Sequence, residues 1–380
     1  MNIEQKKWTK ATGWETLRND NLDYLNCNLV IAFGSREILS DSFLYESIKS
    51  SYPNANILMN STSGEIIDRQ VNDETISLTA IEFEKTKIKT AITHIGAVRN
   101  SFEAGYFLAR ALDPVNLANV LVISDGQKVN GSDLVLGLQE FLPKDTIITG
   151  GLAGDGDRFQ KTLVGLNESP NEGRIVAIGF YGKNLTVTHG SVSGWDSFGP
   201  ERLITKSKGN LLSELDGQPA LDIYKKYLGE YADELPGSGL LFPLSIRKDE
   251  NSEAIVRTIL SIDEDAKSLR FAGNMPEGFY ARLMNANFDR LIEGATNAAI
   301  NSMKNILQKP DLAILISCVG RKLVLNQRIE EEVEGVKAIF GDTTAITGFY
   351  SYGEISPSFN FNKCELHNQT MTITTLSETN

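Results

Sequence analysis

The sequence predicts an α/β protein of the mixed α+β kind, with two domains built from three related β-α-β-β units and mixed sheets. One pattern occurs three times: an apolar run ending in a glycine turn, a helix-periodic stretch, and a second apolar run ending in a glycine–acid pair. Each copy spans roughly 30 residues, the size of a βαβ unit. Each copy also continues into alternating, strand-like segments, which predicts sheets that are not purely parallel.

The three copies are aligned by their glycine turns and glycine–acid pairs. Their first apolar runs, helical stretches and closing segments are 28–35, 40–51 and 57–66; 120–126, 132–142 and 146–155; and 312–320, 325–339 and 345–355. In the second copy Leu134, Leu138 and Phe141 form one apolar stripe at helical spacing. Pro143 lies where that helix should stop.

The remaining segments complete the architecture. Strand-like tails follow each closing pair, at 76–83 and 87–93, at 162–166, 174–181 and 185–188, and at 364–376. Helical stretches at 101–112 and 288–307 precede the second and third copies. Residues 205–228 and the strand pair 256–262 and 268–271 differ from the repeat. We expect an N-terminal extension at 1–26, one domain with two units at 27–221, and a second domain with one unit at 222–376.

Composition excludes several classes of protein. The 380 residues carry a net charge of −12, which argues against nucleic acid and anionic lipid as partners. The three cysteines have no metal-ligand spacing. The chain begins without an apolar leader, and its longest apolar run is far shorter than the ~18 residues of a spanning helix, so we expect a cytoplasmic protein with no membrane insertion.

Several motifs, in this order and spacing, resemble the FIST family of bacterial sensory proteins, with its N-terminal (FIST N) and C-terminal (FIST C) domains. The resemblance covers about residues 27–375. It rests on Gly-Gly-Leu-Ala-Gly-Asp at 150–155, Glu-Leu-Asp-Gly-Gln-Pro-Ala at 214–220, Ser-Cys-Val-Gly-Arg at 317–321, Gly-Phe-Tyr-Ser-Tyr-Gly-Glu-Ile at 348–355 and His-Asn-Gln-Thr at 367–370.

This resemblance implies a sensor, not an enzyme, that binds a small ligand such as an amino acid. Because the chain has no room for an output module, we expect it to signal in trans to a histidine kinase or another two-component or cyclic-di-nucleotide signalling protein. Some freestanding family members of similar length are described as haem-binding nitric oxide sensors. That branch is the alternative reading, with haem as the candidate cofactor.

The closing loops provide the candidate ligand-binding residues, because loops at the C-terminal ends of parallel strands bind ligands in open α/β sheets. The acids there suit a ligand ammonium, and Arg321 suits a carboxylate. In the alternative interpretation the acids cap neighbouring N–H groups and Arg321 pairs with Glu354. The candidates are Ser63, Gly64, Glu65, Gly151, Gly154, Asp155, Arg321, Tyr352, Gly353 and Glu354.

Differences among the three loops favour a pocket with unlike walls, near the domain junction, over a symmetric scaffold. His94 and His189 are the candidate haem ligands, since haem needs an axial His or Cys. They follow the first two closing loops at matching places, and hydrogen bonding within a β-rich segment is their alternative role. No hydrolase, zinc-protease or phosphate-loop motif occurs, and Cys318 is the one candidate nucleophile, without an assignable base.

Overall fold

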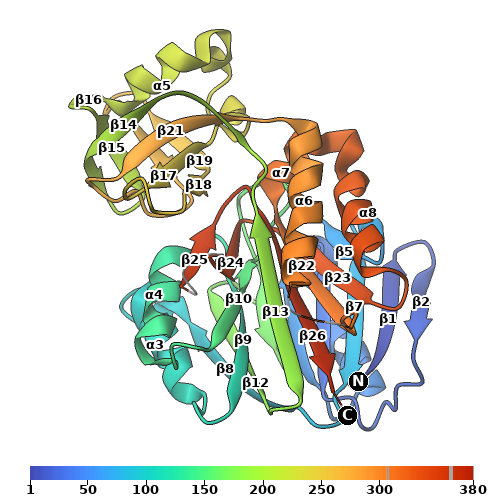
Figure 1. Cartoon of the computed structure of the whole chain (residues 1–380). Helices are drawn as coiled ribbons and strands as arrows, with labels where there is room; N and C mark the ends of the chain where they lie inside the picture. The colour runs from blue at the N-terminus through green and yellow to red at the C-terminus, as the bar shows by residue number, and fades with distance from the viewer. Residues whose placement is uncertain (305, 307, 359–362, 380) are drawn as a thin grey trace.

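The computed structural model describes residues 1–304, 306, 308–358 and 363–379. It shows a body of three six-stranded sheets with helices outside them and a smaller lobe at one end, while both chain termini lie at the opposite end (Figure 1). The predicted fold class is confirmed. None of the helices in the described part of the chain combines the length and the hydropathy needed to cross a bilayer.

Each of the three predicted units forms two parallel strands joined by helix. The first is β3 (Leu29–Gly34), α1 (Arg36–Leu39), α2 (Ser42–Ser51) and β4 (Asn56–Ser61). The second is β9 (Leu117–Ser124), α4 (Gly131–Phe141) and β10 (Ile147–Leu152). The third is β22 (Leu312–Cys318), α7 (Val319–Leu325), α8 (Ile329–Phe340) and β23 (Ala345–Ser351).

Each unit is the centre of one sheet. Sheet one has the order β11 (Val164–Leu166), β4, β3, β7 (Ile76–Glu82), β1 (Asn2–Thr9), β2 (Gly13–Asn19). Sheet two has the order β25 (Cys364–His367), β24 (Gly353–Pro357), β10, β9, β12 (Arg174–Tyr181), β8 (Lys87–His94). Sheet three has the order β13 (Leu185–Val192), β26 (Met371–Glu378), β22, β23, β5 (Glu65–Ile67), β6 (Gln70–Asn72).

The units exchange strands in a ring. After its closing loop, each unit leaves its own sheet: β5 of the first unit pairs with β23 of the third, β24 of the third with β10 of the second, and β11 of the second with β4 of the first. A later strand of the first and second units also enters the next sheet: β8 of the first unit pairs with β12 in sheet two, and β13 of the second pairs with β26 in sheet three. β1, from the predicted N-terminal extension, pairs with β7 and completes the ring.

The central strands are buried on both faces, which explains their almost uninterrupted apolar sequences. Ile31, Ile123 and Ile316 point into one core shared by the three sheets. Their neighbours Val30 and Val122 belong to separate clusters on the outer faces, beneath the helices. The alternation of a strand therefore builds a common interior and three outer layers at the same time.

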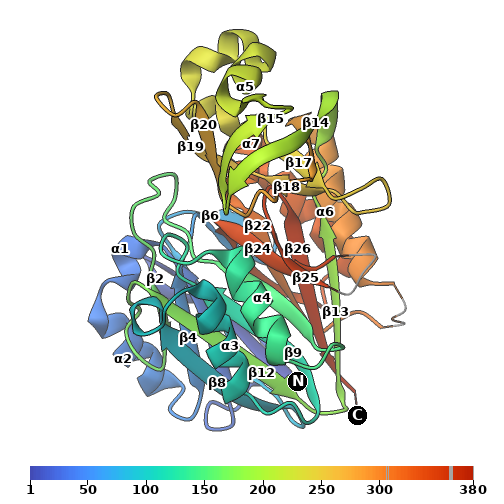
Figure 2. The same ribbon diagram turned by 90° about the vertical axis from the view of Figure 1, so that its left-hand side faces the viewer.

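Helices cover the outside of each sheet. α3 (Ser101–Ala111) and α4 lie side by side over sheet two (Figure 2). They approach closely because a Cβ on Gly105 would lie 2.1 Å from the carbonyl oxygen of Leu134. α6 (Phe288–Ser302) and α8 cover sheet three. The described helix ends at Ser302, and residues 305 and 307 of the predicted 288–307 stretch lie outside the described residues.

The lobe is an insertion between the second and third units. Its sheet has the order β18 (Ile255–Arg257), β17 (Leu244–Arg247), β21 (Tyr280–Asn285), β14 (Asp196–Lys208), β15 (Leu211–Leu215), β20 (Ser268–Phe271), β19 (Ile259–Asp263), and β16 (Gln218–Pro219) pairs with β15. α5 (Ala220–Leu228) packs on it. Only the segments 193–195 and 286–287 connect the lobe sheet to the body.

Candidate functional site

The three closing loops meet at one place and hydrogen-bond in a ring. The backbone N–H of Ser63 donates to Tyr350 O (2.8 Å), that of Gly154 to Ser61 O (2.9 Å), and that of Tyr352 to Leu152 O (3.1 Å). Each donor belongs to one unit and each acceptor to another. We call this meeting point the hub. The loops thus pack against one another at the hub, and Leu152 and Tyr352 beside it also line a cavity described below. That the loops line a pocket with unlike walls stays a prediction.

Two of the hub acids occupy equivalent, fully buried positions. Glu65 accepts hydrogen bonds from the hydroxyls of Thr62 (2.6 Å) and Thr75 (2.8 Å). Glu354 accepts from the hydroxyl of Ser351 (2.6 Å) and from the N–H of Thr370 (3.3 Å). Burial raises the pKa of Glu65 to about 7 and that of Glu354 to about 8. Both carboxyl groups are therefore used inside the protein.

The third acid is neutralised differently. Asp155 is also buried, and it pairs with Arg36 (2.9 Å) and Arg158 (2.6 Å), while the backbone N–H of Lys161 donates to it (3.1 Å). The pKa of Arg158 is raised mainly by its hydrogen bond to Asp155. The shorter Asp side chain cannot reach a hydroxyl three residues earlier, where this copy has Leu152.

The predicted glycines and Ser63 serve the packing of the hub. Gly154 packs so closely that a Cβ would lie 2.4 Å from Ser63 Oγ. Gly64 has a φ of +134°, and a Cβ on it would meet the Lys322 side chain, whose Nζ donates to Ser63 O (2.9 Å). Gly151 and Gly353 lie in the paired strands β10 and β24.

Arg321 is not placed to meet a ligand carboxylate. Its side chain is fully buried and donates to Glu332 Oε2 from Nε (3.1 Å) and Nη2 (2.7 Å), to Ser193 O (2.5 Å) and to Leu291 O (2.6 Å). The expected alternative partner, Glu354, is also wrong, since Glu332 occupies that role. Sequence reasoning missed Glu332 because it lies a helical segment away, among three consecutive glutamates.

The histidines do not form a haem site. His94 ends β8 and its Nδ1 accepts from the N–H of Gly96 (2.9 Å), while His189 lies within β13, opposite Thr374, and burial lowers its pKa. Their predicted equivalence is wrong by three positions, because Val192 is the last residue of β13. His367 contacts Ser356 O (3.1 Å) and lines a cavity of about 260 Å³, below the usual ligand-pocket range of ~300–1,000 Å³. Haem therefore does not fit the described histidines.

A larger cavity, of about 780 Å³, lies between the lobe and the body. The body contributes the turns after β9 and β10, α7 and Tyr352, at the C-terminal ends of parallel strands, where α/β sheets bind ligands. The lobe contributes β19, β20, the turn between β14 and β15, and the segment 236–240. The lining comprises Gly126, Gln127, Lys128, Val129, Asn130, Leu152, Asp157, Phe159, Asn210, Pro236, Gly237, Leu240, Ile259, Leu260, Ser261, Arg270, Ala272, Leu323 and Tyr352. We call it the junction cavity.

Two opposite charges in the junction cavity have no ionic partner. Arg270, on β20 of the lobe, donates only to Asn210 Oδ1 (3.3 Å), and no carboxylate among the described residues lies within salt-bridge distance of it. Asp157, on the body, has no hydrogen bond or ion pair to its carboxylate within the described part of the chain. Lys128, by contrast, pairs with Glu172 (2.7 Å). The site thus offers one cation from the lobe and one anion from the body.

Sequence reasoning identified only one lining residue of this cavity, Tyr352. Asp157, which lines the cavity, follows the glycine-dense stretch 150–156, in which the predicted candidate was Asp155. Arg270 belongs to the inserted lobe, and no repeat or motif indicated it. Three or more His, Cys, Asp or Glu side chains in metal-binding proximity do not occur among the described residues.

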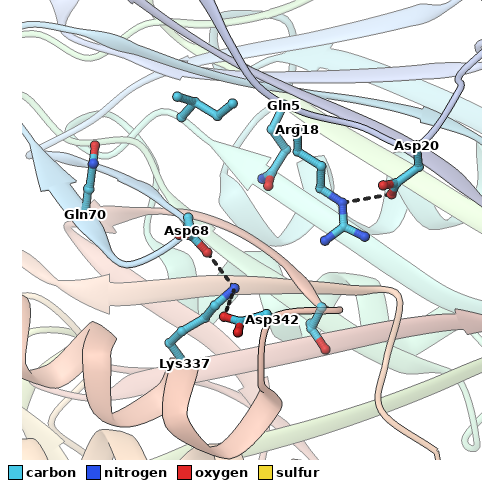
Figure 3. A pocket seen from close by; sticks show the side chains of 9 residues that line it. Gln5, Arg18, Asp20, Asp68, Gln70, Lys337 and Asp342 are labelled. Carbon is cyan, nitrogen blue, oxygen red and sulfur yellow. Dashed lines mark hydrogen bonds and ion pairs between the residues drawn. The ribbon is translucent and has the colours of Figure 1, made fainter.

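A second cavity, of about 510 Å³, lies at the other end of the parallel strands (Figure 3). It is lined by the β1–β2 hairpin, the β5–β6 turn and the end of α8. Its charges neutralise each other: Lys337 contacts Asp68 (2.6 Å) and Asp342 (3.9 Å), and Arg18 contacts Asp20 (2.8 Å). Among the described residues no such pairing satisfies the charges of Arg270 and Asp157, so the junction cavity is the stronger candidate.

These features define a class: a two-part α/β protein with a small-molecule cavity between an inserted lobe and a pseudo-threefold body. The family model described as the FIST N domain matches residues 28–218, and that described as the FIST C domain matches 220–357. The chain therefore belongs to the FIST family. FIST domains are sensory rather than catalytic and are associated with the sensing of small ligands and with signalling. No curated protein matches the chain.

The border between the two family matches falls inside the lobe, just before α5. Strands β14, β15 and β16 of the lobe come from the FIST N part, and the rest of its sheet comes from the FIST C part. The lobe is thus built jointly by the two halves. The domain boundary that we expect near residue 221 stays a prediction. In space, the chain is divided into the body and the lobe instead.

Proposed function

We propose that this protein senses an amino acid-like zwitterion in the junction cavity and signals its presence in trans to a partner protein. One observation supports this most: Arg270 and Asp157, each without an ionic partner, line one cavity from opposite sides. A ligand carboxylate suits the guanidinium, and a ligand ammonium suits the carboxylate. A zwitterion bound this way connects the lobe to the body.

The signal would be a change in the position of the lobe. A ligand that contacts both the lobe and the body stabilises the lobe position in which both contacts are made. The shift in the equilibrium between lobe positions can be no larger than the difference in the ligand's binding free energy for them. Polar contacts already join the parts beside the cavity: Asn274 of the lobe donates to Asp133 (3.0 Å) and accepts from Asn130 (3.0 Å), which is the N-cap of α4. We propose that a histidine kinase, or another two-component or cyclic-di-nucleotide signalling protein, reads the resulting surface.

The magnitudes indicate how such a ligand is held. Arg270 and Asp157 are exposed to solvent, so each ion pair with a ligand contributes about 0.2–1 kcal/mol. Burial of an apolar ligand group contributes about 25 cal/mol per Å², several kcal/mol for a large side chain. The two charges therefore fix orientation, and the apolar lining provides most of the affinity.

Thermal unfolding in the presence of each common amino acid tests the proposal. A ligand at 100 times its Kd stabilises the folded state by about 2.7 kcal/mol, which raises the melting temperature. The rise should vanish in Arg270→Ala and Asp157→Asn. Arg69→Ala, which removes an exposed guanidinium beside the cavity at the other end of the parallel strands, is the matched control and should keep the full rise. If no amino acid or related small zwitterion raises the melting temperature, the proposal is wrong.

The haem-based nitric oxide sensor remains the alternative that the family resemblance suggests. No observation favours it here, since no histidine lines the junction cavity and His94 and His189 lie in strands with local partners. We therefore assign the sensing role to the junction cavity, without haem.

A further inference from the structure

One wall of the junction cavity is an aromatic pair held in an unusual backbone conformation. Phe159 has a φ of +51°, in the left-handed region that bulky side chains rarely adopt. Its ring stacks on Tyr352, with centroids 4.6 Å apart and planes 18° apart. Both residues line the cavity.

Hydrogen bonds hold this pair in place. The backbone N–H of Phe159 donates to the hydroxyl oxygen of Tyr352 (3.1 Å), and that hydroxyl donates to Gly156 O (3.2 Å). Tyr352 is only 7 % exposed, whereas Phe159 is half-buried. The ring surface that a ligand can reach therefore belongs mainly to Phe159, and Tyr352 fixes it from behind.

Apolar side chains from the lobe and from α7 line the same cavity as Phe159. The lobe contributes Leu240 and Ile259 to the same cavity, and α7 contributes Leu323, which is 39 % exposed. Aromatic rings prefer to pack on other aromatic rings in offset or tilted stacks, a preference that aliphatic side chains do not share. This apolar lining lies in one cavity with Arg270 and Asp157.

We propose that the ligand is an α-amino acid with an aromatic side chain. Its ring packs on Phe159, its carboxylate meets Arg270 and its ammonium meets Asp157. This inference rests on the proposed function and deepens it by naming the ligand class. Phe159 is the residue that selects the side chain, and the two charges select the zwitterion.

Calorimetric titration of the full chain with L-tryptophan, L-tyrosine, L-phenylalanine, L-leucine and L-glutamate tests the class. At least one aromatic amino acid should bind 10-fold or more tightly than leucine and glutamate. Tryptamine, which lacks the carboxylate, and indole-3-propionate, which lacks the ammonium, should each bind at least 10-fold more weakly than tryptophan if tryptophan is the preferred ligand. If tyrosine or phenylalanine is preferred, its own analogues without the carboxylate or without the ammonium replace these two.

Variants of Phe159 test its role. Phe159→Ala should weaken the aromatic ligand roughly 10- to 100-fold. Phe159→Gly should do the same and guards against misfolding, because glycine adopts a positive φ without strain. Phe43→Ala, which removes a phenylalanine that is 75 % exposed on α2, should leave affinity unchanged.

The outcomes separate the two proposals. Tighter binding of leucine or glutamate, or unchanged affinity in both Phe159 variants, would overturn the aromatic class and leave amino acid sensing in place. Binding of a nucleotide but no amino acid would overturn both proposals. Failure of every amino acid and related zwitterion to bind would likewise overturn the proposed function and this inference together.

Discussion

The buried pair of Arg321 and Glu332 should couple strongly in a double-mutant cycle. The perturbation is Glu332→Leu, alone and with Arg321→Met. Glu332→Leu removes two of the four hydrogen bonds of the guanidinium and leaves its charge buried without a counter-ion. Breaking a buried pair in this way costs about 3–5 kcal/mol. Arg321→Met should cost a similar amount, because it leaves the buried Glu332 carboxylate without its counter-ion and strips a donor from the carbonyl groups of Ser193 and Leu291.

The double variant should cost much less than the sum of the two single variants. Replacing both charges with apolar side chains removes the uncompensated charge, and what remains is the loss of partners for nearby carbonyl and hydroxyl groups, about 1–3 kcal/mol. We therefore expect a coupling energy of at least about 2 kcal/mol. Urea unfolding, followed by tryptophan fluorescence, measures each midpoint and slope.

An exposed pair provides the control for this cycle. Arg99 and Glu103 form an i,i+4 pair in which the arginine is 86 % exposed, so Glu103→Gln should leave the urea midpoint unchanged. Additive effects in the Arg321–Glu332 cycle would refute the reasoning. They would show that the guanidinium is not held by Glu332, and Arg321 would become available again as a group for a ligand carboxylate.

Three further predictions concern the hub and the histidines. Burial raises the pKa of Glu65 to about 7 and that of Glu354 to about 8, above the ~4.3 of an unfolded chain. The contribution of these two groups to stability should therefore be greatest below pH ~4.3 and should fall as the pH rises to about 8. Chemical denaturation across that range should show this fall in the wild type and its loss in the Glu65→Gln, Glu354→Gln double variant. Gly150→Ala should lower the free energy of unfolding by at least about 2 kcal/mol, because its Cβ would lie 1.8 Å from a backbone carbonyl oxygen. Gly209→Ala has open space around it and should show only the smaller cost of a positive φ. Urea unfolding of both variants measures the difference. Hemin titration should produce no Soret band of a histidine-ligated haem, and a band lost on one His→Ala change would contradict our placement of the histidines.

The three units could be predicted from sequence because their cause is local. An apolar strand buried on both faces, a helix with one apolar stripe and a glycine turn all have short-range signatures. Ile31, Ile123 and Ile316 recur in runs of the same kind, and the structure places them in one core. The strand at 268–271 also lies where its pattern predicted, whereas the predicted strand 256–262 is divided between β18 and β19.

The exchange of strands between units could not be predicted, because periodicity specifies a strand but not its neighbour. β5 has three residues, and its apolar sequence suits the edge of any of the three sheets. Its pairing with β23 goes together with contacts in the hub between residues far apart in the chain, such as Gly154 with Ser63 and Gly64 with Lys322. The same limitation hid Glu332 as the partner of Arg321.

The repeated acids have internal partners in the hub. Glu65, Asp155 and Glu354 recur because each unit needs a buried acceptor where its chain leaves one sheet for another. A pseudo-symmetric feature of this kind solves the same structural problem three times. A ligand site needs different groups on different sides, and we propose it where the repeat is broken, at the lobe inserted between the second and third units.

The lining residues of the junction cavity are of two kinds: those that belong to the threefold repeat and those that do not. Tyr352 belongs to the repeat and supports the hub, while Phe159 and Asp157 lie in the longer loop that only the second unit has after its glycine–acid pair. Arg270 comes from the lobe, which the repeat does not contain. The residues least explained by the threefold architecture are therefore the ones to which we assign recognition, and the ones whose substitution should change binding without dismantling the body.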